Sequence, residues 1–357
     1  MDRYLESLEH EILLVRRGRR SGLYTIVAVH STARGPSLGG CRMWTYADSR
    51  AAVRDALRLS RAMTFKSAVA DLPLGGGKGV IVLPPGYAPP AGEPRRDVLL
   101  DFGESVGSLA GAYVTAEDVG TSDRDMAVIA EVTDSVAGLA VERGSSGDPS
   151  PWTALGVRCA MEVACERAFG SPSLAGRRVS VIGLGRVGGK LARLMAEAGA
   201  ELVVADVDDG KRALADELDA RWTDPVSALR AKVDVVAPCA LGGALDDESV
   251  PALHCGVIAG AANNQLAADT VAVELAERGI VWAPDFVANA GGIINISVEL
   301  EPGGYDPARA EARVRGVADT TRTVLDHADA TGATPLAAAM EIARARLAEA
   351  RSPRAAA

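Results

Sequence analysis

The sequence predicts an α/β protein of two domains, on three observations. The chain has 357 residues, more than one hydrophobic core usually organises. Residues 142–153, "ERGSSGDPSPWT", cluster glycine, serine and proline and indicate a crossing between domains. After this break, short apolar runs alternate with helical segments, which is the pattern of a parallel sheet covered by helices on both faces.

The first half is expected to combine strands and helices. Residues 22–31, "GLYTIVAVHS", are rich in β-branched and aromatic side chains and predict a strand. Residues 49–63 keep the spacing of a helix with one buried face, and residues 80–83 predict another strand. After an exposed Pro/Gly-rich loop, helical patterns return around 97–110 and 122–131.

The second half begins with a predicted helix at 153–168. Near the C-terminus, "DP" at 306–307 and "TP" at 334–335 each place a capping side chain before a proline, which predicts two helix starts separated by Gly332. The strands expected in between are 178–185, 201–206, 233–238, 256–261 and 280–284.

Composition narrows the classes of function. The formal net charge of −9 argues against a nucleic-acid partner, and no run of about 18 apolar residues suggests a membrane span. The N-terminus lacks the basic-then-apolar pattern of a signal peptide. Five scattered cysteines without a C-x-x-C pair, and only four histidines, predict a cytoplasmic protein with reduced thiols and no metal site.

A glycine pattern between a predicted strand and helix indicates a dinucleotide site. Gly183, Gly185 and Gly188 stand in G-x-G-x-x-G order, and the next strand ends in Asp206. The glycines permit a tight turn and a close approach of pyrophosphate to the helix N-terminus. Asp206 would bind the ribose hydroxyls and repel a 2′-phosphate, which predicts NAD rather than NADP, although Arg212 leaves an opening for NADP. The alternative is a strand–turn–helix with incidental glycines.

A second glycine-rich stretch, "DLPLGGGKGVIVL" at 71–83, surrounds Lys78. A phosphate-binding P-loop would need glycine at position 72 and serine or threonine after the lysine, but the residues there are Leu72 and Gly79. The P-loop interpretation therefore fails. The glycines can instead leave room for backbone and substrate to approach the amine.

Lys66 and Asp118 could share a site with Lys78. Two neighbouring amines, partly buried, should lower the lysine pKa from about 10.4 toward the range of about 7–8 that suits a general base. Asp118, in "YVTAEDVG", would partly offset the positive charges, and Glu117 is the rival because strand alternation lets only one of them face the site. The alternative is that these are ordinary surface charges.

At these residues the chain resembles the Glu/Leu/Phe/Val dehydrogenase superfamily, on its leucine, valine and phenylalanine branch. The resemblance covers most of residues 20–300. The matching segments are "GPSLGGCRMW", "DALRLSRAMTFK", "LPLGGGKGVIV", "TAEDVG", "SSGDPSPWTALGV", "GLGRVGG", "APCALGG", "GAANNQL" and "PDFVANAGGIIN".

The resemblance implies an N-terminal α/β catalytic and oligomerisation domain, a Rossmann-type NAD-binding domain, and an active site in the cleft between them. The first domain is expected at 1–140, joined by C-terminal helices at about 330–357, and the second at 141–329. The implied activity is reversible, NAD-dependent oxidative deamination of an L-amino acid to a 2-oxo acid, ammonium and NADH. A homo-oligomer, a dimer or larger, is also implied.

The resemblance also assigns roles to residues. Lys66 matches the lysine that binds the substrate carboxylate, Lys78 the lysine that activates water, and Asp118 the acid that handles the amine's protons. Two departures adjoin them, because Cys41 and Gly79 stand where the family commonly has threonine and serine or threonine. The other implied substrate-binding residues are Leu38, Gly39, Gly40, Met63, Asn263, Asn264, Ile293 and Ile296, and the implied cofactor-binding residues are Thr153, Gly183, Gly185, Arg186, Val187, Gly188, Asp206, Cys239, Ala240 and Asn263.

The substrate is expected to be aliphatic. Leu38 stands where glutamate-type members carry a lysine, and a buried glutamate side chain without a partner would cost several kcal/mol. If Ile293 and Ile296 line the pocket, their bulk favours valine, isoleucine or leucine, although both could be core residues. A phenylalanine or tryptophan dehydrogenase, or a catalytically silent NAD-binding regulator, are the alternatives.

Overall fold

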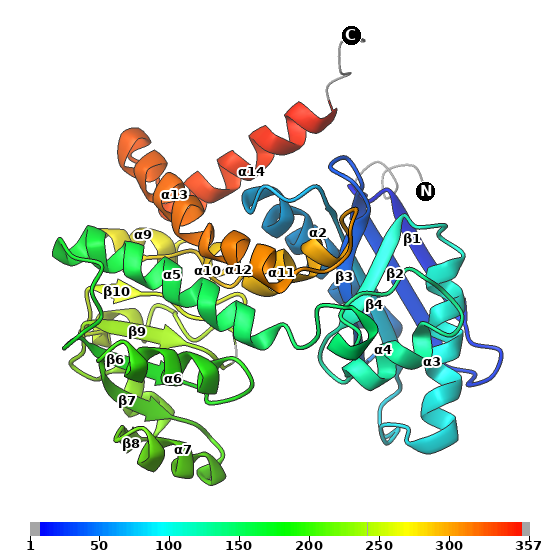
Figure 1. Ribbon diagram of the computed structural model, residues 1–357, viewed down its shortest axis with the longest axis horizontal. Coiled ribbons are helices and arrows are strands. Elements are labelled where there is room, and N and C mark those ends of the chain that lie inside the picture. Colours follow the sequence, from blue (N-terminus) through cyan, green and yellow to red (C-terminus); the bar gives the residue numbers. More distant parts are fainter. Residues whose placement is uncertain (1–7, 241, 352–357) are drawn as a thin grey trace. The chain divides into compact units, whose positions relative to one another are not determined.

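The computed structural model describes residues 8–240 and 242–351. Contacts divide them into two compact units (Figure 1). Unit 1 contains residues up to 148 together with 296–306 and the stretch from 343 onward, and unit 2 contains residues 149–295 and 307–342. The domain boundaries expected from the sequence, 1–140 and 141–329, are a separate prediction, which this division by contacts does not test.

Unit 1 is built on a mixed five-stranded sheet of order β1-β2-β4-β3-β5. Strand β2 is antiparallel to β1 and β4, whereas β3 is parallel to β4 and β5. The glycines of the "GGGKG" stretch belong to β4 itself and do not form a loop before it. The strands are β1 (Ile12–Arg17), β2 (Tyr24–Ser31), β3 (Ser37–Thr45), β4 (Gly75–Leu83) and β5 (Tyr113–Glu117).

Helix α2 (Ser49–Val69) packs against β2 and β4. The predicted helix end at residue 63 is wrong, because no glycine or proline interrupts the chain before Pro73 and the helix continues for six more residues. Lys66 therefore lies in the last turn of α2. A Cβ added to Gly76 would stand 2.0 Å from the backbone nitrogen of Thr64, so the helix lies directly on the β4 backbone.

The other face of this sheet holds the main core of unit 1. Helices α3 (Gly92–Gly107) and α4 (Asp123–Ile129) supply Phe102 and Ile129 to a buried apolar cluster that also contains Tyr113. Both helices were expected, although α3 begins five residues earlier than predicted. The short 3-10 turn η1 (Val141–Arg143) precedes the crossing into unit 2.

Unit 2 carries a fully parallel sheet of order β11-β10-β9-β6-β7-β8. This is the doubly wound order of dinucleotide-binding folds, so the predicted Rossmann-type sheet is confirmed (Figure 1). Strand β8 was not expected, because it has only three residues. The strands are β6 (Arg178–Ile182), β7 (Glu201–Ala205), β8 (Arg221–Thr223), β9 (Val235–Pro238), β10 (Val257–Ile258) and β11 (Val281–Trp282).

Helix α5 (Ser150–Phe169) opens unit 2 and packs against α6 (Gly188–Glu197) and α13 (Val317–Thr331). The first predicted C-terminal helix is divided at Gly316, and Gly332 ends α13 in a left-handed conformation. The remaining elements are η2 (Asp209–Lys211), α7 (Arg212–Glu217), α8 (Pro225–Leu229), η3 (Val250–Ala252), α9 (Val271–Glu277), α10 (Asp285–Ala288), α11 (Gly291–Glu299), α12 (Pro307–Arg315) and α14 (Pro335–Arg351).

Thr334 caps the last helix as expected, since its hydroxyl oxygen accepts a hydrogen bond from the backbone nitrogen of Ala337 at 3.2 Å. Within the described ranges, none of the helices is both long enough and apolar enough to cross a membrane.

Candidate active site

A lysine–aspartate pair, in which the lysine is buried and the aspartate half-buried, lies on the sheet of unit 1. Lys78 projects from β4 and donates a hydrogen bond from Nζ to Oδ2 of Asp118 at 2.7 Å. Asp118 is the first residue after β5, and β3 lies between the two strands. A Cβ on Gly40 of β3 would stand 2.6 Å from the Cβ of Asp118, so glycine is needed for this close approach.

Arg42 is a second cation on the same carboxylate, and sequence reasoning missed it. Its Nε donates to Asp118 Oδ2 at 3.0 Å. Burial alone would raise the pKa of the Asp118 carboxyl, but Lys78 and Arg42 outweigh it and hold that pKa below its usual value. The sequence did contain a signal for Arg42. It stands two residues after Gly40 within "GGCRMW", and strand alternation places both on the same face of β3.

A further carboxylate holds Arg42 in turn. Asp55 of α2 accepts from Arg42 Nη1 at 3.0 Å and from the hydroxyl of Tyr46 at 2.8 Å, both on Oδ2. Arg58 donates to its other oxygen at 2.9 Å. A chain of opposite charges therefore runs from the helix, through the arginine, to Asp118 and Lys78.

The other unit 1 residues named from the sequence lie on β3 and α2. Leu38 is buried and shares its strand face with Gly40, whereas the carbonyl of Gly39 accepts a hydrogen bond from the Tyr113 hydroxyl at 2.6 Å. Met63 and Lys66 are half-buried in the last two turns of α2. A shared substrate position for Lys66 and Lys78 stays a prediction.

Cys41 and Gly79, the two departures from the family pattern, lie on the opposite face of the sheet from the Lys78 side chain. They pair with each other across β3 and β4, and Cys41 is part of the apolar cluster around Phe102. A Cβ on Gly79 would stand 2.4 Å from the Phe102 ring. Burial raises the pKa of the Cys41 thiol well above its usual value. The two departures therefore belong to the core packing behind the site.

The glycine loop of unit 2 follows β6 directly. Gly183 has a φ of 96°, and a Cβ on Gly188 would stand 1.8 Å from the Gly183 carbonyl oxygen. Gly185 faces open space, with no atom within 4 Å of an added Cβ. Asp206, after β7, accepts from the backbone nitrogen of Leu184 at 2.6 Å, so its carboxylate fixes the loop.

Asp206 can still bind a ribose. Its second oxygen accepts from the backbone nitrogen of Asp208 at 2.9 Å, and each carboxylate oxygen keeps a further lone pair. Arg212, the residue that left an opening for NADP, places its guanidinium carbon 5.6 Å from the centre of the Trp222 ring. The Asp206 carboxylate therefore keeps the capacity to accept further hydrogen bonds beside the glycine loop.

Cys239 and Ala240 flank the glycine loop. A Cβ on Gly183 would stand 2.7 Å from the Ala240 Cβ, and one on Gly188 would stand 2.9 Å from the Cys239 Cβ. The loop residues Arg186 and Val187 are exposed and half-buried, respectively. The structure therefore brings Gly183, Gly188, Cys239 and Ala240 together at the carboxyl ends of β6 and β9.

The two asparagines lie in the loop after β10, and both are exposed. Asn263 accepts a hydrogen bond on Oδ1 from Nδ2 of Asn289 at 2.9 Å, and Asn264 adopts a left-handed φ of 52°. Asn289 was not named from the sequence, although it stands inside the matching segment "PDFVANAGG". It orients the Asn263 side chain.

Thr153 and the two isoleucines lie on α5 and α11. The Thr153 hydroxyl donates to the carbonyl of Pro149 at 3.1 Å and would stand 2.7 Å from a Cβ on Gly292. Ile293 and Ile296 are both buried, three residues apart on one helix. Burial fits a core position and a pocket position equally, so both interpretations stay open.

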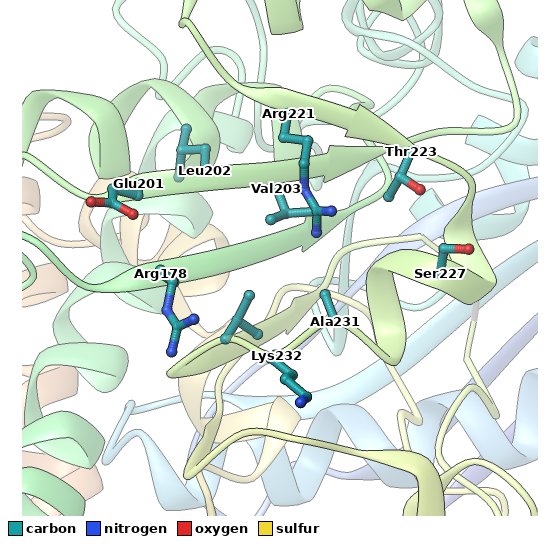
Figure 2. A pocket seen from close by; sticks show the side chains of 10 residues that line it. Arg178, Glu201, Leu202, Val203, Arg221, Thr223, Ser227, Ala231 and Lys232 are labelled. Atoms are coloured by element: carbon teal, nitrogen blue, oxygen red, sulfur yellow. The ribbon is translucent and has the colours of Figure 1, made fainter.

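One cavity of unit 2 lies away from the glycine loop. It has a volume of about 580 Å³, and Figure 2 shows the side chains of Arg178, Arg221 and Lys232 around it. Arg178 and Arg221 begin β6 and β8, whereas the glycine loop follows the last residue of β6. Ligands of open α/β sheets bind at the carboxyl ends of the strands, so this cavity is not the dinucleotide site.

Comparisons with known proteins identify the family. The family model described as Glu/Leu/Phe/Val dehydrogenase, dimerisation domain, matches residues 11–135, and the model described as Glutamate/Leucine/Phenylalanine/Valine dehydrogenase matches residues 204–354. The chain is 42% identical to leucine dehydrogenase of Bacillus subtilis (strain 168), over 97% of this chain and 93% of that protein. It is 44% identical to valine dehydrogenase of Streptomyces virginiae, over 96% and 95%.

A solved structure extends the likeness to the fold. The L-tryptophan dehydrogenase from Nostoc punctiforme is 35% identical, with a TM-score of 0.82 over 98% of this chain and 99% of that one. Together with the matches along both halves of the sequence, this shows that the chain belongs to the Glu/Leu/Phe/Val dehydrogenase family, oxidoreductases that act on the CH–NH2 group of amino acids with a nicotinamide dinucleotide.

Proposed function

We propose that the protein catalyses NAD-dependent, reversible oxidative deamination of an aliphatic L-amino acid, leucine, valine or isoleucine, to the 2-oxo acid, ammonium and NADH. The observation that carries the proposal is the pair formed by the buried Lys78 and the half-buried Asp118, with 2.7 Å between Nζ and Oδ2. A pair of this kind can move protons at a substrate without a metal ion. The full-length likeness to leucine and valine dehydrogenases supports the aliphatic substrate class.

The residues would divide the chemistry as follows. Lys66 holds the substrate carboxylate and keeps Cα in line for hydride transfer. Asp118 takes a proton from the substrate ammonium, which leaves the neutral amine that oxidation converts to an iminium. Lys78, once unprotonated, takes a proton from the water that attacks Cα. Asp118 then returns its proton to the amine nitrogen, and the C–N bond breaks as the carbinolamine hydroxyl gives its proton to Asp118 and becomes the carbonyl. The released ammonia takes up that proton and leaves as ammonium, and Lys78 loses the water proton to solvent.

The dinucleotide would lie at the glycine loop of unit 2. Gly183, Gly185 and Gly188 leave space for the pyrophosphate, and Asp206 binds the adenosine ribose. When bound, the nicotinamide supplies the hydride acceptor. Thr153 and Asn263, with Asn263 oriented by Asn289, would position the ring and the substrate.

NAD is proposed over NADP because of charge. The Asp206 carboxylate, with Asp208 and Asp209 exposed beside it, would repel a 2′-phosphate. Arg212 is engaged over the Trp222 ring. We expect kcat/KM to favour NAD by at least about 1.4 kcal/mol of transition-state binding, or tenfold. Equal or higher kcat/KM with NADP would contradict this assignment.

Leu38 supports an apolar side-chain pocket. It is buried on the face of β3 that also carries Gly40, and it offers no partner to a glutamate carboxylate. An aromatic substrate is the second candidate, favoured by the 35% identity to an L-tryptophan dehydrogenase. One missing or extra methylene changes binding by only about 1–3 kcal/mol, so several aliphatic amino acids should react.

The test is NADH formation at alkaline pH with L-leucine, L-valine, L-isoleucine, L-phenylalanine, L-tryptophan and L-glutamate. The highest kcat/KM is expected with one of the first three. A higher kcat/KM with phenylalanine or tryptophan would select the aromatic alternative. Binding of NAD without turnover of any of the six would select a catalytically silent regulator and end the proposal.

We also propose a homo-oligomer assembled through unit 1 and located in the cytoplasm. The family model that matches residues 11–135 is described as a dimerisation domain. Among the described residues, strand β1 lies at the edge of its sheet, where a second copy could pair with its outer backbone groups, and Val15 on this strand is 48% exposed. Five free thiols fit a reducing compartment. Light scattering of the purified protein would give the number of copies.

A further inference from the structure

The charged chain behind Asp118 has no part in the roles assigned so far. Arg42 lies between two carboxylates, 3.0 Å from Asp118 Oδ2 and 3.0 Å from Asp55 Oδ2. Its side chain is 22% exposed and that of Asp55 16%, so the contacts are shielded from water. Charge-assisted hydrogen bonds of this kind are stronger and better oriented than neutral ones, and water screens them less than an exposed ion pair.

The two cations on Asp118 share one oxygen. Both Lys78 and Arg42 donate to Oδ2, and in the described part of the chain no donor contacts Oδ1. The Asp118 carboxylate is thus held through Oδ2, and Oδ1 can accept hydrogen bonds from a substrate. The Asp118 side chain keeps 24% exposure, so it is not sealed inside the core.

The two cations differ in their ability to change charge. Lys78 must lose its proton to act as a base, whereas a guanidinium stays protonated at every working pH. When Lys78 becomes neutral, Arg42 is the remaining cation on Asp118. Without either cation, burial would raise the pKa of the Asp118 carboxyl, and no side chain of the described residues would hold Oδ2 in place.

The arginine is itself fixed. Asp55 accepts from Arg42, Tyr46 and Arg58, and the pKa of the Asp55 carboxyl is lowered by Tyr46 and the two arginines against the effect of burial. The neighbours of Asp118 on the other elements, Cys41 and Tyr113, have raised pKa values and remain neutral. Tyr46 also has a raised pKa, so Arg42 and Lys78 are the charged groups that decide the state of Asp118.

We propose that Arg42 is a positioning residue that holds Asp118 by Oδ2 and keeps it ionised while Lys78 is neutral, so that Oδ1 stays available for the proton of the substrate amine. Asp55, anchored by Tyr46, holds the guanidinium in place for this task. The inference rests on the proposed oxidative deamination.

The test compares Arg42→Gln with Arg42→Lys, and uses Arg58→Gln as the matched control. Arg58 also contacts Asp55, but its contact is to the oxygen away from Arg42 and its side chain is 55% exposed. For each protein the pH profile of kcat/KM, kcat, and the Kd for NAD are measured on the full-length chain.

Arg42→Gln should lower kcat about 10- to 100-fold and move the acidic limb of kcat/KM up by about one pH unit, because the Lys78–Asp118 pair loses its permanent cation. Arg42→Lys keeps a cation and should leave the limb near its wild-type position while lowering kcat less. The Kd for NAD should not change in any variant, and Arg58→Gln should stay within about twofold of wild type.

If the Arg42→Gln variant does not fold, the Asp55→Asn variant provides a second test of the same role. It loosens the guanidinium without removing its charge, so kcat should fall while the acidic limb stays in place. An unmoved limb and a kcat within twofold in Arg42→Gln would overturn the inference. A wild-type protein without turnover would instead overturn the proposed function, so the two failures are distinguishable.

Discussion

Glycine is concentrated in two regions of this protein, β4 and the loop after β6, and its structural role differs between them. In β4 the glycines are extended, and neighbouring atoms occupy the space their side chains would need, such as Thr64 against Gly76 and Phe102 against Gly79. In the loop after β6, Gly183 takes a positive φ and Gly185 faces empty space. The first set lets protein pack against protein. The second leaves room for a ligand.

The difference explains why a lysine beside glycines need not bind phosphate. Lys78 projects from a strand whose glycines are already covered, and its partner is a carboxylate. The backbone nitrogens near Gly185 lie instead at the start of α6, where an anion gains from the helix dipole. Four experiments test this difference between the two units.

The largest expected effect is chemical and belongs to β4. Lys78→Ala should lower kcat by about 10²- to 10⁴-fold, because it removes the general base and leaves Asp118 without its nearest cation. The Kd for NAD, measured by fluorescence titration, should stay at the wild-type value. Lys232→Ala, an exposed lysine of unit 2, is the control. Wild-type kcat in Lys78→Ala would contradict the role of this lysine.

The next effect is on stability. Gly76→Ala would place a methyl group 2.0 Å from the backbone nitrogen of Thr64, and backbone cannot rotate away as a side chain can. We expect a loss of about 1–3 kcal/mol or more in the free energy of unfolding, measured by urea denaturation. Gly86→Ala makes the matching change where no atom stands within 4 Å, although its φ of 76° adds some strain. If the Gly76 variant proved the more stable one, the packing described for α2 would be wrong.

The loop glycine should give the opposite pattern. Gly185→Ala meets no atom within 4 Å, so the free energy of unfolding should change by less than about 0.5 kcal/mol. The added methyl should hinder the pyrophosphate and raise the Kd for NAD by about tenfold, or 1.4 kcal/mol. Unchanged NAD affinity would show that the dinucleotide does not approach this glycine.

The smallest expected effect is on the stability of unit 1 at acidic pH. In unit 1 the pKa of Asp101, Asp118 and Asp125 is lowered, against the effect of burial, by hydrogen bonds and neighbouring cations. A lowered folded-state pKa stabilises the fold fully above the unfolded value of about 3.9, and this stability is lost as pH falls through the folded value. Unit 2 also has carboxyls of lowered pKa, Glu217, Asp224 and Asp246, but none of these three is buried, whereas Asp101 and Asp125 are. Hydrogen exchange followed from pH 5 to below pH 3 should therefore show unit 1 opening before unit 2. The reverse order would mean that these carboxyls do not control acid unfolding.

The sequence predicted more of unit 2 than of unit 1. The strands, the glycine loop and Asp206 follow one another within a single β-turn-α-β stretch, so their spacing alone brings them together. The exact strand ends and the three-residue β8 were missed, because so few residues carry little periodicity. In unit 1 the same reasoning named Lys78 and Asp118 but not their partner Arg42, and it ended α2 too early.

By itself, the sequence determined the Rossmann-type order of unit 2 and the kinds of side chain that carry the chemistry, because local periodicity and motif spacing are properties of neighbouring residues. Only the tertiary structure decided which charges meet. Strand β4 lies between β2 and β3, and this non-sequential order brings Lys78 and Arg42 onto one carboxylate oxygen of Asp118. It also turns Cys41 and Gly79 to the far face. Pairing between distant strands is set by packing of the whole sheet, which no short stretch of sequence records.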